Sequence, residues 1–422
     1  VPAEDFIRAV LVSLVGSVMC IRDRGRTGRV LVDGAGSTWT NSNNLTVGSS
    51  GSGTLNILNG GAVSDNYSYI GRLSGSTGTA TVDGAGSTWT NGFDMYIGGD
   101  ASSAGGNGTL SVGTGGLVDV GTTLKLWNTG TLNLNGGTVN TGNLDGDGTL
   151  NFNAGTLGIA NDLLLDTSSP LGTGVSLTSF KTLNVSGTTT LNGFNTLTID
   201  GGTFSTGSLV NNGGFDFNSG TFNLTGDNLV IGAGGLFGPL AQFDYGKAVN
   251  VTNTASVDSG AVLSLDNGAF NAGTLNNNGQ VTLSGAVASL GGGTLNNTGL
   301  VAGNGQVNLV LANSSSGEVR ATTGNSLLFG SAGNTNSGQI SLQGGTVQFT
   351  QNLTNSSTGL ITGRGTLYTT GGLTNQGNIG LSSGTTDLHG DINNTTGGSI
   401  IVSGNGTATF YDDLVHNGTE IR

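Results

Sequence analysis

The decapeptide Val32–Asn41, VDGAGSTWTN, returns unchanged at Val82–Asn91, 50 residues later. Farther along the chain the repeats are shorter: GTLNLN at Gly130–Asn135 becomes GTLNFN at Gly148–Asn153 after 18 residues. Repeats of this size are typical of solenoid proteins, in which each unit stacks only on its neighbours. The sequence therefore predicts a repeating architecture rather than a rounded globule.

Each unit reads as alternating apolar and polar residues, then a Gly-Gly or Ser-Gly pair, then Thr-Val or Thr-Phe. Such alternation gives a strand one apolar face, and the glycines permit the positive φ of tight corners. One coil of about 20 residues cannot bury that face alone, so stacked coils must cover one another. We predict an all-β fold, a single-stranded right-handed parallel β-helix of about 20 coils. Leu132 should lie over Leu150, and amide ladders should join Asn133 to Asn151, Asn277 to Asn297, and Asn355 to Asn394.

Composition supports this fold and excludes several classes of protein. The 422 residues include 81 Gly and 3 Pro, without the triplet period of collagen, and only 9% are charged. The net charge of −13, with five of the arginines inside the first 29 residues, argues against binding to nucleic acid or to anionic membranes. The single cysteine, Cys20, cannot form an intrachain disulfide. No apolar run is long enough for a membrane-spanning helix, so no direct membrane insertion is expected.

The chain divides into three parts. Residues 1–28 contain VSLVGSVMCIRDR, which we interpret as non-native sequence of the adapter read-through type or, if native, as a capping helix, because the apolar residues between Phe6 and Ile21 have helical spacing. Residues 30–125 hold the tryptophan-containing repeat pair. Residues 126–422 form a generic β-helix that we expect to be truncated at its C-terminus. Within it, Gly158–Phe180 and Gly226–Lys247 break the pattern and are predicted to be irregular coils or protruding loops.

The motif VDGAGSTWTN…LTVG…GTLNILNGGAV, within Val30–Val120, resembles the repeat of type V autotransporter passengers and of exosortase-sorted (PEP-CTERM) bacterial surface proteins. The remainder, as in TNSSTGLITGRGTLYTTGG, is similar to generic passenger β-helix. The resemblance implies an exported, non-enzymatic protein, extracellular or at the bacterial cell surface in association with the outer membrane.

The best constellation of reactive side chains is Asp387, His389 and Asp391, which a 22-residue offset places against Tyr411, Asp412 and Asp413. Asp391 and Asp413 are weak candidates for a Ca²⁺ site or an acid–base pair, the alternative being a solvated turn. Trp39 and Trp89 are candidate platforms for a sugar ring, although packing between coils is the more frequent use of such a residue. No cofactor is expected.

The leading hypothesis is a non-enzymatic, structural or adhesive surface protein whose partners are surface glycans or other cell-surface components. The alternative is a polysaccharide lyase or glycoside hydrolase on the same fold, which needs clustered Asp, Lys or Arg in a cleft. An ice-binding solenoid would need a T-x-T array on successive coils, whereas Thr38 and Thr40 find sequence counterparts only at Thr88 and Thr90.

Overall fold

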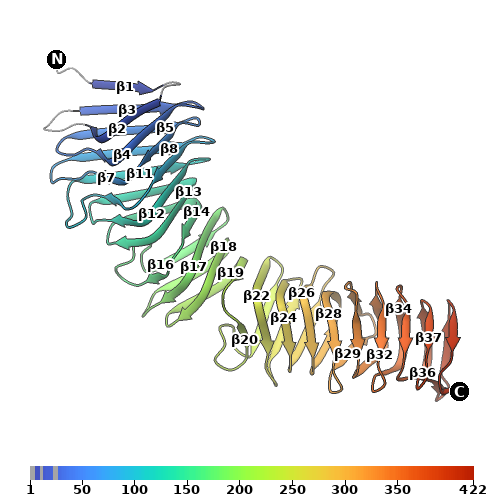
Figure 1. Ribbon diagram of the computed structural model, residues 1–422. Helices are drawn as coiled ribbons and strands as arrows, with labels where there is room; N and C mark the ends of the chain where they lie inside the picture. The colour runs from blue at the N-terminus through green and yellow to red at the C-terminus, as the bar shows by residue number, and fades with distance from the viewer. Residues whose placement is uncertain (1–4, 10–12, 22–26) are drawn as a thin grey trace. The chain divides into compact units, whose positions relative to one another are not determined.

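The computed structural model describes residues 5–9, 13–21 and 27–422, with side chains from residue 27 onward. Its elements are β-strands without helices among these residues, paired in parallel as a β-solenoid of about 19 turns (Figure 1). The prediction of a parallel β-helix is thus confirmed. The chain forms two compact units, Val1–Phe222 and Asn223–Arg422.

The first unit contains β1 to β18 and most of β19. The bounds are β1 Asp5–Ala9, β2 Ser13–Ile21, β3 Thr27–Asp33, β4 Thr38–Val47, β5 Ser52–Leu58, β6 Ala62–Asp65, β7 Tyr67–Ile70, β8 Thr77–Asp83, β9 Thr88–Asn91, β10 Met95–Ile97, β11 Asn107–Gly113, β12 Leu117–Leu126, β13 Gly130–Gly146, β14 Thr149–Ile159, β15 Leu163–Leu165, β16 Gly174–Thr178, β17 Lys181–Leu191, β18 Thr196–Asn211 and β19 Gly214–Leu224.

The second unit contains the remaining strands. The bounds are β20 Leu229–Ile231, β21 Leu240–Asp244, β22 Lys247–Val257, β23 Val262–Asp266, β24 Ala269–Asn277, β25 Gln280–Ser284, β26 Ser289–Asn297, β27 Leu300–Gly303, β28 Gly305–Asn313, β29 Glu318–Thr322, β30 Ser326–Phe329, β31 Asn334–Asn336, β32 Gln339–Phe349, β33 Leu353–Asn355, β34 Leu360–Thr369, β35 Leu373–Asn375, β36 Asn378–His389, β37 Ile392–Asn394, β38 Ser399–Ser403, β39 Thr407–Phe410, β40 Leu414–His416 and β41 Glu420–Ile421.

Like residues lie over like residues in successive turns, as the repeats predict. Leu132 pairs with Leu150, and Asn133 with Asn151, in the ladder between β13 and β14. Leu132 is fully buried and Leu150 is 8% exposed. Each such aliphatic side chain contributes about 1.5–3 kcal/mol when its neighbours in adjacent turns exclude water. The core is therefore a column of side chains that runs through each unit.

The 50-residue repeat spans two turns rather than one. Val32 pairs with Ile57, which pairs with Val82, and Trp39 is likewise separated from Trp89 by Val63. Identical decapeptides therefore do not touch. The register instead alternates a large tryptophan with a smaller valine, which fills the interior without crowding two indole rings.

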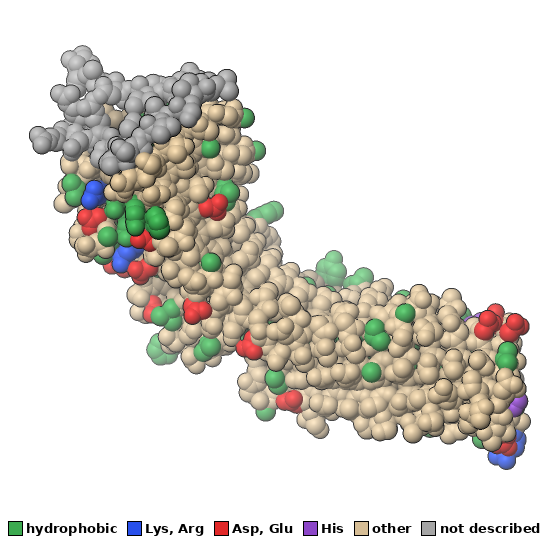
Figure 2. All heavy atoms as spheres, in the orientation of Figure 1, with side chains coloured by type: hydrophobic (Ala, Val, Ile, Leu, Met, Phe, Trp, Pro, Cys, Tyr) green, Lys and Arg blue, Asp and Glu red, His purple; other side chains and the backbone are tan. Residues whose placement is uncertain are grey.

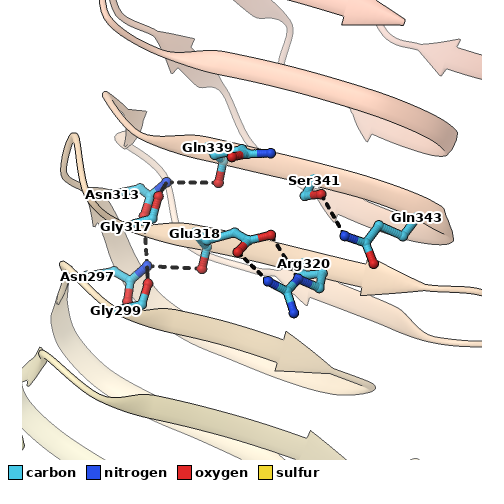
Figure 3. Close-up of polar contacts among 9 residues, drawn as sticks. All are labelled: Asn297, Gly299, Asn313, Gly317, Glu318, Arg320, Gln339, Ser341 and Gln343. Carbon is cyan, nitrogen blue, oxygen red and sulfur yellow. Dashed lines mark hydrogen bonds and ion pairs between the residues drawn. The ribbon is translucent and has the colours of Figure 1, made fainter. Parts of the chain in front are cut away.

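A buried amide ladder runs along one corner of the second unit. Asn297 Nδ2 donates to Asn313 Oδ1 at 2.7 Å and also to the backbone oxygen of Gly299 (Figure 3). The ladder includes two of the three predicted pairs: Asn277 donates directly to Asn297, whereas Asn375 lies between Asn355 and Asn394. Its members, in order, are Asn277, Asn297, Asn313, Asn336, Asn355, Asn375 and Asn394, and it ends on His416 Nδ1.

Glycine is required where the backbone turns tightly against the next coil. Gly48 has a φ of +74°, and a Cβ at this position would lie 2.3 Å from the backbone oxygen of Thr77. Both the left-handed conformation and the close approach exclude a side chain. The high glycine content thus follows partly from the geometry of the corners.

The first residues depart from the helical interpretation. Residues 5–9 and 13–21 are the strands β1 and β2, which pair in parallel with β3 and β4. The capping helix is therefore wrong, because an exposed sheet edge offers the backbone a continuous set of partners that outweighs apolar periodicity. Residues 1–4, 10–12 and 22–26 lie outside the described residues, and a non-native origin for residues 1–28 stays a prediction.

The two interruptions of the repeat are turns of the solenoid that carry loops. In the first, β15 and β16 pair with β17 and β18, and in the second, β20 and β21 pair with β22 and β23. The loops that they carry, residues 166–173 and 232–239, leave and rejoin the strands at one corner. Corners tolerate insertions because their backbone faces solvent.

Candidate functional site

The predicted cluster near the C-terminus of the sequence assembles with the expected offset. His389, at the end of β36, stacks on Tyr411 with ring centroids 4.1 Å apart and on Tyr368 of β34 at 4.3 Å. Asp387 shares the outward face of β36 with His389, as the alternation predicts. The three rings form a ladder parallel to the stacking direction, so their faces cover one another and mainly their edges meet solvent.

The carboxylates beside this ladder are held by backbone amides. The amide of Gly390 donates to Asp412 Oδ2 at 2.6 Å, and the amide of Asp413 donates to Asp391 Oδ1 at 3.3 Å. A hollow of about 290 Å³ lies here, lined by Tyr368, Thr370, His389, Gly390, Asp391 and Asp412. Within residues 27–422, no group of three or more His, Cys, Asp or Glu side chains is placed to hold a metal ion. Asp391 and Asp413 are thus neighbours, joined through the Asp413 amide, without a third ligand of these types among residues 27–422, and a Ca²⁺ site at this pair stays a prediction.

The proposed sugar platforms are not on the surface. Trp39 is 1% exposed and Trp89 is fully buried. The prediction of glycan contact at these residues is wrong, because both indoles point into the core, where the strand alternation directs them. The alternative, packing between coils, agrees with the structure.

Trp89 instead organises a buried polar network. Its Nε1 donates to Asp65 Oδ2 at 2.7 Å, while Ser68 Oγ and Asn91 Nδ2 donate to Asp65 Oδ1. Burial raises the pKa of Asp65 to about 6, although these hydrogen bonds act in the opposite direction. Trp39 Nε1 has no hydrogen-bond partner in the described structure, so the two tryptophans of the repeat differ in their polar environment.

An outward aromatic cluster in the first unit was missed by the sequence reasoning. Tyr69 of β7 stacks on Tyr96 of β10, with centroids 5.4 Å apart, and the Arg72 guanidinium lies 4.6 Å from the Tyr69 ring. Burial, reinforced by a hydrogen bond to Asp94, raises the pKa of Tyr96 to about 12. Tyr69 and Tyr96 are each 9% exposed. Their rings therefore serve mainly to cover the strands beneath them.

The first unit contains a further hollow, which is built around a loop. It measures about 390 Å³ and lies between the loop after β15 and the turn that joins β17 to β18. Its lining residues are Asp166, Thr167, Thr173, Asn192, Gly193, Phe194 and Asn195. Hydrogen bonds from Ser168 Oγ and from the Ser168 amide hold the pKa of Asp166 below its usual value, so this carboxylate is ionised at neutral pH. Only the break in the repeat at Gly158–Phe180 could have drawn attention to this corner.

Charged side chains are sparse on the visible face of each unit, and much of that surface is neither charged nor hydrophobic (Figure 2). No helix among the described residues has the length and apolarity needed to cross a membrane. No family model matches the chain, and no curated protein matches it. The structure therefore shows a parallel β-solenoid, and these comparisons give no evidence for a family of autotransporter passengers or exosortase-sorted proteins.

Proposed function

We propose that this protein is a non-enzymatic, structural or adhesive solenoid displayed outside the bacterial cell. The fold supports this proposal, because each unit is held by contacts between neighbouring turns and leaves its corners free to vary. The repeat motif at Val32–Asn41 and Val82–Asn91 supports an extracellular location through its resemblance to exported surface proteins.

The observation that carries the proposal is the separation of structural and displayed residues. The interior is filled by columns of apolar side chains and by the buried amide ladder from Asn277 to Asn394. The amides of this ladder hydrogen-bond to one another from turn to turn. Loops such as residues 166–173 are inserted at the corners and display side chains such as Thr167 and Ser168, while Pro170 is buried and its oxygen accepts from the Leu150 amide. A scaffold of this kind can present binding groups at fixed positions, as an adhesin must.

Adhesion under flow tests the proposal. Beads coated with the purified chain, and albumin-coated beads as the control, are passed over cell layers and over glass coated with bacterial polysaccharide. We expect retention of the solenoid-coated beads well above the albumin control. Equal retention of both kinds of bead on every surface would contradict an adhesive function.

The alternative, a polysaccharide lyase or glycoside hydrolase, has one observation in its favour. His389, Asp391 and Asp412 line the same hollow, and such groups are able to transfer protons during cleavage of a glycosidic bond. Incubating the protein with neutral and acidic polysaccharides and measuring new reducing ends or unsaturated products tests this alternative. Turnover that Asp391→Asn abolishes would establish an enzyme and overturn the non-enzymatic proposal.

A further inference from the structure

We propose that the hollow around Phe194 in the first unit is a carbohydrate-binding site, in which a sugar ring stacks on Phe194 and donates hydroxyl hydrogen bonds to Asp166. This inference rests on the proposed adhesive function and names the ligand class of one of its contact sites. It replaces the two buried tryptophans as the place of glycan contact.

Phe194 presents a whole aromatic ring to solvent. It lies in the turn Asn192–Asn195 between β17 and β18 and is 102% exposed. The turn is fixed by the hydrogen bond from the Asn195 amide to the Asn192 oxygen and by the positive φ of Gly193, 63°. A large apolar side chain held this far out of the core gains nothing from burial, so its position suits contact with a ligand.

Asn195 fixes the turn that carries Phe194. The residue is 4% exposed, and its Nδ2 donates to the backbone oxygens of Leu165 and Asn192. Its Oδ1 has no hydrogen-bond partner among the described residues and is closed off from solvent, so a ligand in the hollow does not reach it. Asn195 therefore holds Phe194 in place beside the hollow and is a positioning residue of the site.

Asp166 supplies a charged acceptor among the residues that line the hollow. Its Oδ1 accepts from the amide and the hydroxyl of Ser168, at 2.8 Å and 2.6 Å, which fixes the carboxylate at the start of the loop. The hydroxyls of Thr167 and Thr173 complete the polar lining of the hollow.

This combination selects one class of ligand. A pyranose ring has a flat C–H face that packs on an aromatic ring and hydroxyl donors around its rim, which match acceptors placed beside that ring. A phosphate or another anion is disfavoured by Asp166 and by the absence of a basic side chain among the lining residues. A hollow of about 390 Å³ has room for a short segment of a glycan chain.

Binding to soluble oligosaccharides tests the site. Cello-, manno-, xylo- and chito-hexaose are titrated against the full chain by calorimetry, and any hexaose that binds is then titrated against three variants. We expect Phe194→Ala to weaken binding by about two- to tenfold and Asp166→Asn by about three- to tenfold. Phe180→Ala is the matched control, because Phe180 is 87% exposed in the same unit and does not line the hollow. Its affinity should equal that of the unchanged protein.

The outcomes separate the site from the proposed function. The site is overturned if none of the hexaoses binds, or if Phe194→Ala binds as tightly as Phe180→Ala. If hexaose binding fails while coated beads still adhere, the adhesive function stands without this site. If a hexaose binds through Phe194 while the beads fail to adhere, the site stands and the adhesive function is wrong. Far-ultraviolet circular dichroism of each variant confirms that the fold is unchanged.

Discussion

Asn355 tests whether the buried amide ladder holds the second unit together. The side chain is fully buried, accepts from Asn336 Nδ2 at 2.7 Å and donates to Asn375 Oδ1 at 2.7 Å and to the Gly359 oxygen at 3.2 Å. Asn355→Ala removes both rungs of the ladder. It also leaves the Oδ1 of Asn375 without a hydrogen-bond donor among the described residues.

The expected cost follows from these contacts. Two side-chain hydrogen bonds contribute about 1 kcal/mol each, and a buried acceptor left without a donor adds about 1–3 kcal/mol. We therefore expect Asn355→Ala to destabilise the surrounding turns by about 3–5 kcal/mol. The matched control is Asn151→Ala, which removes a rung of similar length, 2.8 Å to Asn133 Oδ1, from an exposed ladder. Water replaces that bond, so the control should cost less than about 1 kcal/mol.

Hydrogen exchange is the suitable assay, because long repeat arrays do not unfold in one cooperative step. Peptides that cover residues 353–378 should exchange at least about 100-fold faster in Asn355→Ala, whereas peptides around residue 151 in the control should change by less than about tenfold. Urea titration followed by circular dichroism gives an independent measure of the loss. If the two substitutions have equal effects, the buried ladder does not carry the stability assigned to it here.

Three further predictions concern the buried network and the register. Burial raises the pKa of Asp65 from 3.8 to about 6, so its contribution to the free energy of unfolding is fully present below about pH 4 and falls by about 3 kcal/mol as the pH rises through 6. Asp65→Asn should reduce the difference in stability between urea titrations at pH 4 and pH 7, and an unchanged difference would refute this role of Asp65. Trp89→Phe should cost about 1.5–3 kcal/mol more than Trp39→Phe, since only Trp89 Nε1 donates to a carboxylate; equal thermal stabilities would contradict this. Removal of Ser337–Asn375 deletes two whole turns and keeps the strand register, so circular dichroism should still show a folded protein. Removal of Ser337–Thr366 shifts the register and should prevent folding. Identical behaviour of the two deletions would argue against a fold held only by contacts between neighbouring turns.

The sequence alone determined the architecture. Alternation of apolar residues at Leu132 and Leu134, and its return at Leu150 and Phe152, fixed both the strands and their vertical pairing, because a strand with one apolar face has few ways to bury it. The same reasoning placed His389 against Tyr411 from their spacing alone. Local periodicity was misleading only where sheet pairing opposed it, in the strands Asp5–Ala9 and Ser13–Ile21.

The tertiary structure decided which side chains are available for binding. Trp39 and Trp89 looked like platforms in the sequence, yet the parity of their positions along the strands turns both indoles inward, and a shift of one residue would have reversed this. Phe194 carries no repeat or motif, and only the meeting of a loop with a corner two strands later sets it beside Asp166. Burial and unmet hydrogen-bonding capacity depend on residues distant in the chain, so a repeat pattern predicts the scaffold far better than it predicts the site.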